Sequence, residues 1–207
     1  MKFRYTSNFY PVPFEPEHFI NGGHVDITDW TEGGEEHILG RVAIDCLNVN
    51  RVMDERQGPH LFDVCDADSQ GWHDVFSSLF DVETCELMPE VDSDMIFDNI
   101  LLIHRMYLHP VLQPWEASIV YHMARLQGLT SILVMLSGAT SLPTKALVEL
   151  GFSKLANCEF LYLPAMRSKL PKEDPPFPPL LELDEAIDYT SDVLENWSED
   201  DFDDEDF

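Results

Sequence analysis

The chain has 207 residues, 44% of them hydrophobic, which is enough for one ordinary domain with a sizeable core and a tail. It carries 39 acidic residues against 12 lysine and arginine residues, a formal net charge of −27. A field of that sign repels the phosphates of nucleic acids and of anionic membranes. We therefore expect no direct nucleic-acid binding and no membrane binding, and we expect basic partners.

Targeting and redox patterns point to a cytoplasmic protein. The sequence has no uninterrupted apolar run of about 18 residues, which predicts no transmembrane helix. Its first residues lack the apolar segment of a secretion signal. The cysteines at positions 46, 65, 85 and 158 are widely spaced and form no Cys-x-x-Cys pair, so free thiols are favoured over a disulfide or zinc framework.

The first fifty residues predict strands. Residues 2–6 suit a short edge strand, and residues 24–30 alternate between polar and apolar side chains, as a half-exposed strand does. A glycine-rich turn at 31–36 leads into residues 38–49, which are long enough to pair with 24–30 as a hairpin.

Residues 61–80 predict a capped helix. Asp68 or Ser69 is a suitable N-cap, and five following apolar residues share one helical face: Trp72, Val75, Phe76, Leu79 and Phe80. Asp63, Asp66 and Asp68 have two interpretations, a metal or catalytic carboxylate cluster and a set of caps in a solvated loop. Their spacing does not match a calcium loop, which favours the interpretation as caps in a solvated loop.

Residues 99–136 predict a strand, a helix and a second strand. The apolar run 100–108 ends at His109-Pro110, because proline donates no ladder hydrogen bond. Pro114 suits the first position of a helix that runs to Gly128, and residues 131–136 supply the next strand. This order predicts a βαβ unit.

The C-terminal third predicts a short helix and strand followed by a tail. Residues 143–150 form a helix closed by Gly151, and residues 158–163 form a strand. Five prolines between 171 and 179 predict an extended linker. Residues 180–197 allow a weak amphipathic helix, and we expect the acidic end to be disordered. We therefore divide the chain into an N-terminal arm with the first strands (1–35), a core (36–165), and a linker with an acidic tail (166–207).

Three segments together resemble the GNAT superfamily of N-acetyltransferases. They are Leu101-Leu-Ile-His-Arg-Met-Tyr-Leu-His-Pro110 with Gln113 after it, Glu149-Leu-Gly-Phe152, and Cys158-Glu-Phe-Leu-Tyr-Leu163. The resemblance covers roughly residues 36 to 164. It implies an α+β (α/β/α) fold, in which helices flank a central mixed, mostly antiparallel sheet.

The resemblance also implies a site for acetyl-CoA. The implied residues are the strand edge at Met106 and Leu108 and a phosphate loop with Gln113, Glu116, Ala117 and Ser118. In the family this loop is glycine-rich, because backbone N–H groups at a helix N-terminus hold the pyrophosphate. Here Pro114 removes an N–H group and Glu116 replaces the central glycine. Two like charges ~5 Å apart at a dielectric of ~20 repel by about 3 kcal/mol, or roughly two orders of magnitude in affinity. Alternatively, Glu116 caps its own helix.

The residues for catalysis are also altered. Many family members place a tyrosine four residues before the glycine of Leu-Gly-Phe, as a general acid, and Leu147 stands there in this chain. His104 is a candidate base, because a histidine titrates near neutral pH, and its alternative role is a structural strand residue. We predict no metal site.

Two functions follow from this pattern. The favoured one is a GNAT-like protein that has weakened or lost acetyl-CoA-dependent acyl transfer and binds a basic protein partner through its acidic surface. The other is an active N-acetyltransferase that uses acetyl-CoA on a cationic amine or basic peptide. Whether the chain is an enzyme is therefore left open at the level of sequence.

Overall fold

The computed structural model describes residues 1–8, 15–30, 36–54, 60–91, 97–155 and 158–171. The predicted turn at 31–36, the linker and the tail lie largely or wholly outside these ranges. The described strands form one seven-stranded sheet in the order β1-β2-β3-β4-β5-β7-β6. Their bounds are β1 Lys2–Ser7, β2 Ile20–Trp30, β3 Glu36–Asn48, β4 Asn99–Leu108, β5 Ser131–Leu136, β6 Ser153–Lys154 and β7 Phe160–Pro164.

The sheet is mixed and mostly antiparallel. Only β4 and β5 run parallel among the described pairs, and the helix between them makes the predicted βαβ unit. The α-helices are α1 Val49–Asp54, α2 Leu61–Asp68, α3 Gln70–Leu79, α4 Glu116–Ala124 and α5 Thr144–Leu150. Short 3₁₀ helices are η1 Pro16–Phe19, η2 Pro89–Val91, η3 Pro110–Trp115, η4 Ser137–Ala139 and η5 Ala165–Arg167. This arrangement confirms the predicted α+β class.

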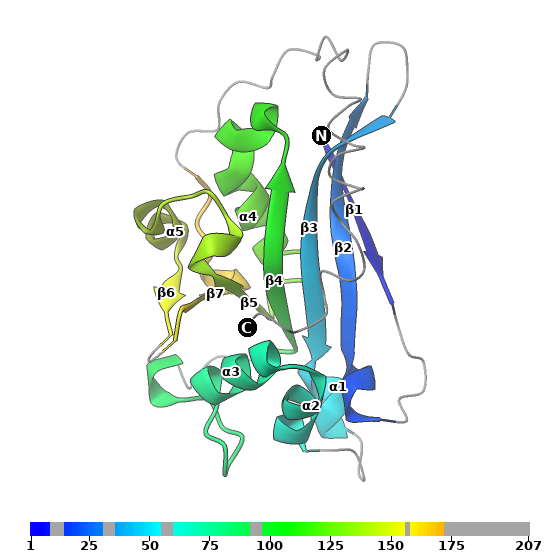
Figure 1. Ribbon diagram of the computed structural model, residues 1–207. Helices are drawn as coiled ribbons and strands as arrows, with labels where there is room; N and C mark the ends of the chain where they lie inside the picture. Colours follow the sequence, from blue (N-terminus) through cyan, green and yellow to red (C-terminus); the bar gives the residue numbers. More distant parts are fainter. Residues whose placement is uncertain (9–14, 31–35, 55–59, 92–96, 156–157, 172–207) are drawn as a thin grey trace.

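Helices cover the two faces of the sheet separately (Figure 1). One apolar cluster packs α4 and α5 against residues such as Ile27, Val42 and Leu133. The other packs α1, α2 and α3 against residues such as Leu47 and Ile100. The result is an α/β/α sandwich with a core on each side of the sheet. No described helix is long and apolar enough to cross a membrane.

Local sequence explains where the helices begin and end. The hydroxyl of Ser69 accepts a hydrogen bond from the Trp72 N–H at 3.3 Å, so the predicted N-cap of α3 is confirmed. Gly151 ends α5 in the left-handed conformation, with φ 109°, also as predicted. Two predictions are wrong in detail. Residues 61–68 form the helix α2 rather than a loop, and Pro114 lies inside η3, so α4 begins at Glu116.

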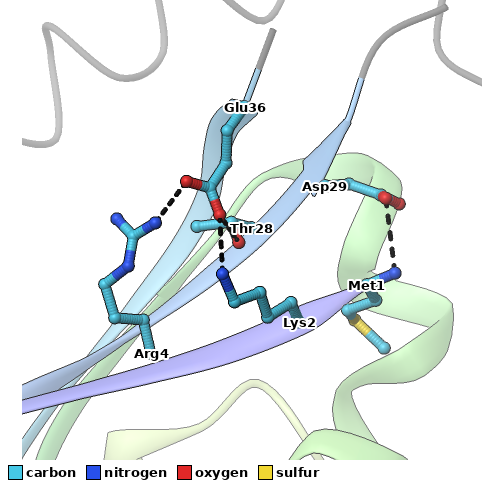
Figure 2. Close-up of polar contacts among 6 residues, drawn as sticks. All are labelled: Met1, Lys2, Arg4, Thr28, Asp29 and Glu36. Atoms are coloured by element: carbon cyan, nitrogen blue, oxygen red, sulfur yellow. Dashed lines mark hydrogen bonds and ion pairs between the residues drawn. The ribbon is translucent and has the colours of Figure 1, made fainter. Parts of the chain in front are cut away.

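The edge strand β1 is attached to the hairpin by polar contacts, as Figure 2 shows. The Glu36 carboxylate accepts hydrogen bonds from Thr28 at 2.9 Å, from Lys2 at 3.5 Å and from Arg4. The bond from Thr28 and the nearby cations lower the pKa of the Glu36 carboxyl. Glu36 thus joins the three strands β1, β2 and β3 at one end of the sheet.

Candidate functional site

The parallel strands β4 and β5 pair along only half of β4. Residues Asn99–Ile103 pair with Ser131–Met135, and β5 ends at Leu136 while β4 continues to Leu108. Among the described residues, no strand pairs with 104–108 on that side, whereas β3 pairs with them on the other. This half of β4, which includes Met106 and Leu108, therefore has an edge in the interior of the sheet that no described strand pairs with.

His104 lies at the point where the two strands separate. Ile103 is opposite Ile44 and Arg105 is opposite Ala43, so His104 is the extra residue of a β-bulge in β4. A bulge of this kind redirects a side chain and often lies beside a functional site. Nε2 of His104 lies 2.7 Å from Oδ2 of Asp45, on β3. His104 is therefore paired with a carboxylate across the sheet.

The same Asp45 oxygen also binds α3. The indole N–H of Trp72 donates to Asp45 Oδ2 at 3.0 Å, and Trp72 is fully buried. Because a carboxylate only accepts hydrogen bonds, Nε2 of His104 carries a proton in this arrangement. Asp45 thus fixes the orientation of the His104 ring.

The loop from His109 to Glu116 uses many of its own N–H groups. The Val111 N–H donates to the His109 ring at 3.2 Å, and the Leu112 N–H donates to the His109 carbonyl at 2.7 Å. The Glu116 N–H donates to the Gln113 carbonyl. Pro110 and Pro114 have no N–H group. The 3₁₀ turn η3 thereby consumes or lacks most of the donors that a phosphate loop would present.

Glu116 is buried at the N-terminus of α4, with 3% of its surface exposed. Its carboxylate accepts hydrogen bonds from the Thr140 hydroxyl at 2.5 Å, the Ser141 N–H at 2.7 Å and the Ser141 hydroxyl. These donors lie on the loop after η4 and not in the first turn of α4. Glu116 instead fastens α4 to the segment that leaves β5.

The residues present do not fit the pyrophosphate of acetyl-CoA. A phosphate loop needs several N–H groups aimed at one point and no competing charge. This loop has two prolines, three N–H groups that donate within it, and a carboxylate at the start of the helix. The turn beside the edge of β4 therefore lacks the anion-binding chemistry of a phosphate loop.

The other predicted residues occupy ordinary positions in the fold. Gln113 is exposed, Ala117 is half-buried against the core, and Ser118 is buried with 4% exposure. Leu147 is fully buried in α5, so no hydroxyl replaces the expected tyrosine there. Asp63 accepts a hydrogen bond from the His60 N–H at 3.2 Å, as a cap does. Within the described ranges, no group of three or more metal-ligating residues comes together.

The sequence did not show that four residues shape this site. Asp45 and Trp72 are far from His104 in the chain, and Thr140 with Ser141 bind Glu116 from 24 and 25 residues away. Asp45 lies in a strand between apolar residues. A carboxylate in such a strand needs a polar partner, and this was the one indication in the sequence that Asp45 has a role.

Comparison with protein-family models and with curated proteins found no match. A solved structure of AtaTR bound with AcCoA is similar to this chain, with a TM-score of 0.34. The two are 16% identical over 70% of this chain and 71% of that chain. At that TM-score the similarity adds no argument, so the fold rests on the strand order and helix positions given above.

Proposed function

We propose that this chain is a GNAT-like protein in which acetyl-CoA binding is weakened or lost and which binds a basic partner through its acidic surface. The observation that supports weakened acetyl-CoA binding is the position of Glu116. Its buried carboxylate stands at the start of α4 and is held by three hydrogen bonds. A pyrophosphate at this helix end would meet a fixed negative charge instead of free N–H groups.

The basic partner is supported by charge alone. A net charge of −27 on 207 residues produces a negative potential that attracts cationic molecules and accelerates their association at low salt. A lysine-rich peptide is the simplest cationic probe of such a surface.

The first experiment titrates the full chain with acetyl-CoA by calorimetry. We expect no heat for the wild type at about 1 mM ligand, a concentration at which a family-like micromolar site would be saturated. Glu116→Gln removes the charge but keeps the shape, and it should raise the affinity by about two orders of magnitude if repulsion dominates. Glu149→Gln, an exposed change on α5, is the matched control and should change nothing. Micromolar binding by the wild type would refute the proposal.

The second experiment titrates the chain with decalysine and with decaglutamate. Decalysine should bind with an affinity that falls steeply between 50 and 500 mM salt, because screening shortens the range of the field. If both peptides bind equally well, or if neither binds, the proposal of a basic partner is contradicted.

A second candidate function is that of an active N-acetyltransferase. It is favoured by the Asp45–His104 pair, which lies beside the edge of β4 that no described strand pairs with. A histidine held by a carboxylate can accept a proton from an ammonium substrate. Acetylation of a polyamine or basic peptide that is lost in both His104→Gln and Asp45→Asn would support it. Turnover that is unchanged by His104→Gln would exclude His104 as the base.

A further inference from the structure

Charged side chains form rows across one face of the sheet. Arg4 on β1 is opposite Asp26 on β2, which is opposite Arg41 on β3, which is opposite Tyr107 on β4. Residues directly opposite each other point to the same face. Lys2 and Arg105 are two residues away from Arg4 and Tyr107 on their own strands, so they also point to this face.

This face carries positive charge on a strongly negative protein. It holds four of the 12 cationic side chains, which we call the basic face: Lys2, Arg4, Arg41 and Arg105. Three described carboxylates lie on the same face: Asp26 binds Arg41 at 2.6 Å, Glu36 binds Lys2 and Arg4, and Asp45 binds His104. Among the described residues, the four cations therefore outnumber the carboxylates of this face by one, whereas acids outnumber cations over the whole chain.

No described helix covers the basic face. Residues Val25, Ile27 and Val42 point to the opposite side, where α4 packs. On the near side, α1, α2 and α3 cross only the other end of the sheet (Figure 1). Trp72, which donates to Asp45, marks the limit of that helical layer. The side chains of Lys2 and Arg4 are 55% and 44% exposed.

We propose that residues 173–207, the acidic tail, dock on the basic face of their own chain. The tail contains 15 acidic residues and no lysine or arginine, so its charge complements that of the face. It also carries aromatic and aliphatic residues, among them Tyr189, Trp197 and Phe202, which can pack on a sheet surface between charged contacts.

The tail is long enough to reach the face. A flexible chain of 35 residues has an end-to-end distance of roughly 30–35 Å, and up to about 115 Å when extended. The described chain ends after η5, where the Lys169 N–H donates to the Leu150 carbonyl beside α5. A 200-residue domain is about 40 Å across, so the tail can cross from β7 to β1. Tethering gives it a millimolar effective concentration without a high intrinsic affinity.

Docking would place the tail beside His104 and Asp45. Arg105 follows His104, the extra residue of the bulge, directly on β4. The basic face would then compete with any cationic molecule for the acidic residues of the tail. The docked tail would also cover the sheet next to the Asp45–His104 pair. The inference requires neither acetyl-CoA binding nor acyl transfer.

The test is zero-length carbodiimide crosslinking of the full chain, read by mass spectrometry. The reagent joins a lysine amine to a carboxylate with loss of water. Lys2 lies 3.5 Å from Glu36, so the Lys2–Glu36 product is an internal reference that reports an intact edge strand. At 150 mM salt, Lys2 should also join to acids of residues 173–207, in preference to Lys145 and Lys154 on the other side of the core.

The matched variants remove two charges each. In Arg4→Gln/Arg105→Gln, the ratio of Lys2–tail to Lys2–Glu36 product should fall about tenfold, since each exposed ion pair changes an equilibrium by about threefold. In Lys145→Gln/Lys154→Gln the ratio should stay as in the wild type. High salt should lower the Lys2–tail product only.

Three results would overturn the proposal. One is tail products spread equally over Lys2, Lys145, Lys154 and Lys169. Another is an unchanged ratio in Arg4→Gln/Arg105→Gln while the reference product persists. The third is tail crosslinks between copies in a mixture of ¹⁴N- and ¹⁵N-labelled protein, which would show an assembly of copies instead of intramolecular docking.

Discussion

Oδ2 of Asp45 accepts hydrogen bonds from two residues on different elements, His104 on β4 and Trp72 on α3. It therefore joins the bulge of the central strand to the helical layer. The indole of Trp72 is fully buried, so a missing acceptor would leave its N–H unsatisfied, whereas the side chain of His104 is 34% exposed. At the scale of single residues, the loss of Asp45 should therefore affect both the bulge of β4 and the packing of α3.

We predict that Asp45→Asn lowers the free energy of unfolding by about 1–3 kcal/mol, because a charged acceptor for two donors becomes a neutral one. Urea unfolding followed by intrinsic tryptophan fluorescence measures this. Asp74→Asn on the exposed side of α3, where Asp74 accepts from Gln70 at 2.7 Å, is the control and should change it by under ~0.5 kcal/mol. Equal effects of the two variants would argue against a special role for Asp45.

Residue types indicated part of this site before the structure was known. His104 was identified because it interrupts an apolar strand, and Glu116 because it stands where the family has glycine. Their partners could not be predicted, because Asp45 meets His104 only through the β3–β4 register and its bulge. Likewise, the contact from Glu116 to Ser141 depends on the path of the chain after β5.

Elements were predicted better than contacts. The order of strands 24–30, 38–49, 100–108, 131–136 and 158–163 matches β2, β3, β4, β5 and β7, because their apolar runs and turns are local features. The helix α2 was missed, since its three aspartates mask an apolar stripe of Leu61, Val64 and Cys65. The start of α4 was predicted two residues early, because a proline also fits a 3₁₀ turn.

The junction of α5 and β6 provides a prediction at the scale of elements. Gly151 has φ 109°, and a Cβ atom there would lie 2.8 Å from the Arg167 carbonyl oxygen. Gly151→Ala therefore adds both a strained backbone and a clash with backbone, and should lower the unfolding free energy by about 2 kcal/mol or more. Gly138→Ala, where a Cβ would meet nothing within 4 Å, is the matched control. Thermal unfolding of both variants measures the difference, and equal melting temperatures would contradict this account.

At the scale of the whole molecule, stability should depend on pH through His24. This residue lies beside Arg41 and Asp26 on the basic face, at 3.7 Å from Asp26. Burial and then the charge of Arg41 lower its pKa below the ordinary value of 6.5, against the opposite effect of Asp26. The folded state therefore binds fewer protons than the unfolded state, and His24 favours folding above pH 6.5.

We expect that stabilising contribution to be lost as the pH falls from 6.5 through the lower pKa of the folded state. Urea unfolding at several pH values between 7.5 and 5 should show a shallower decline for His24→Gln than for the wild type. His122→Gln, on the exposed surface of α4, reports the general effect of losing a histidine. A wild-type decline that His24→Gln leaves unaltered would contradict the assignment.

The position of β7 in the sheet affects how the chain folds during translation. β7 lies between β5 and β6 although both precede it in the sequence. Until Phe160–Pro164 leave the ribosome, β5 has one open edge, and its residues Ser131–Met135 are wholly apolar except for the first. A nascent chain that pauses before residue 160 therefore exposes an interior strand to its neighbours on the same messenger. The final quarter of translation is the stage at which a chaperone would protect this protein most.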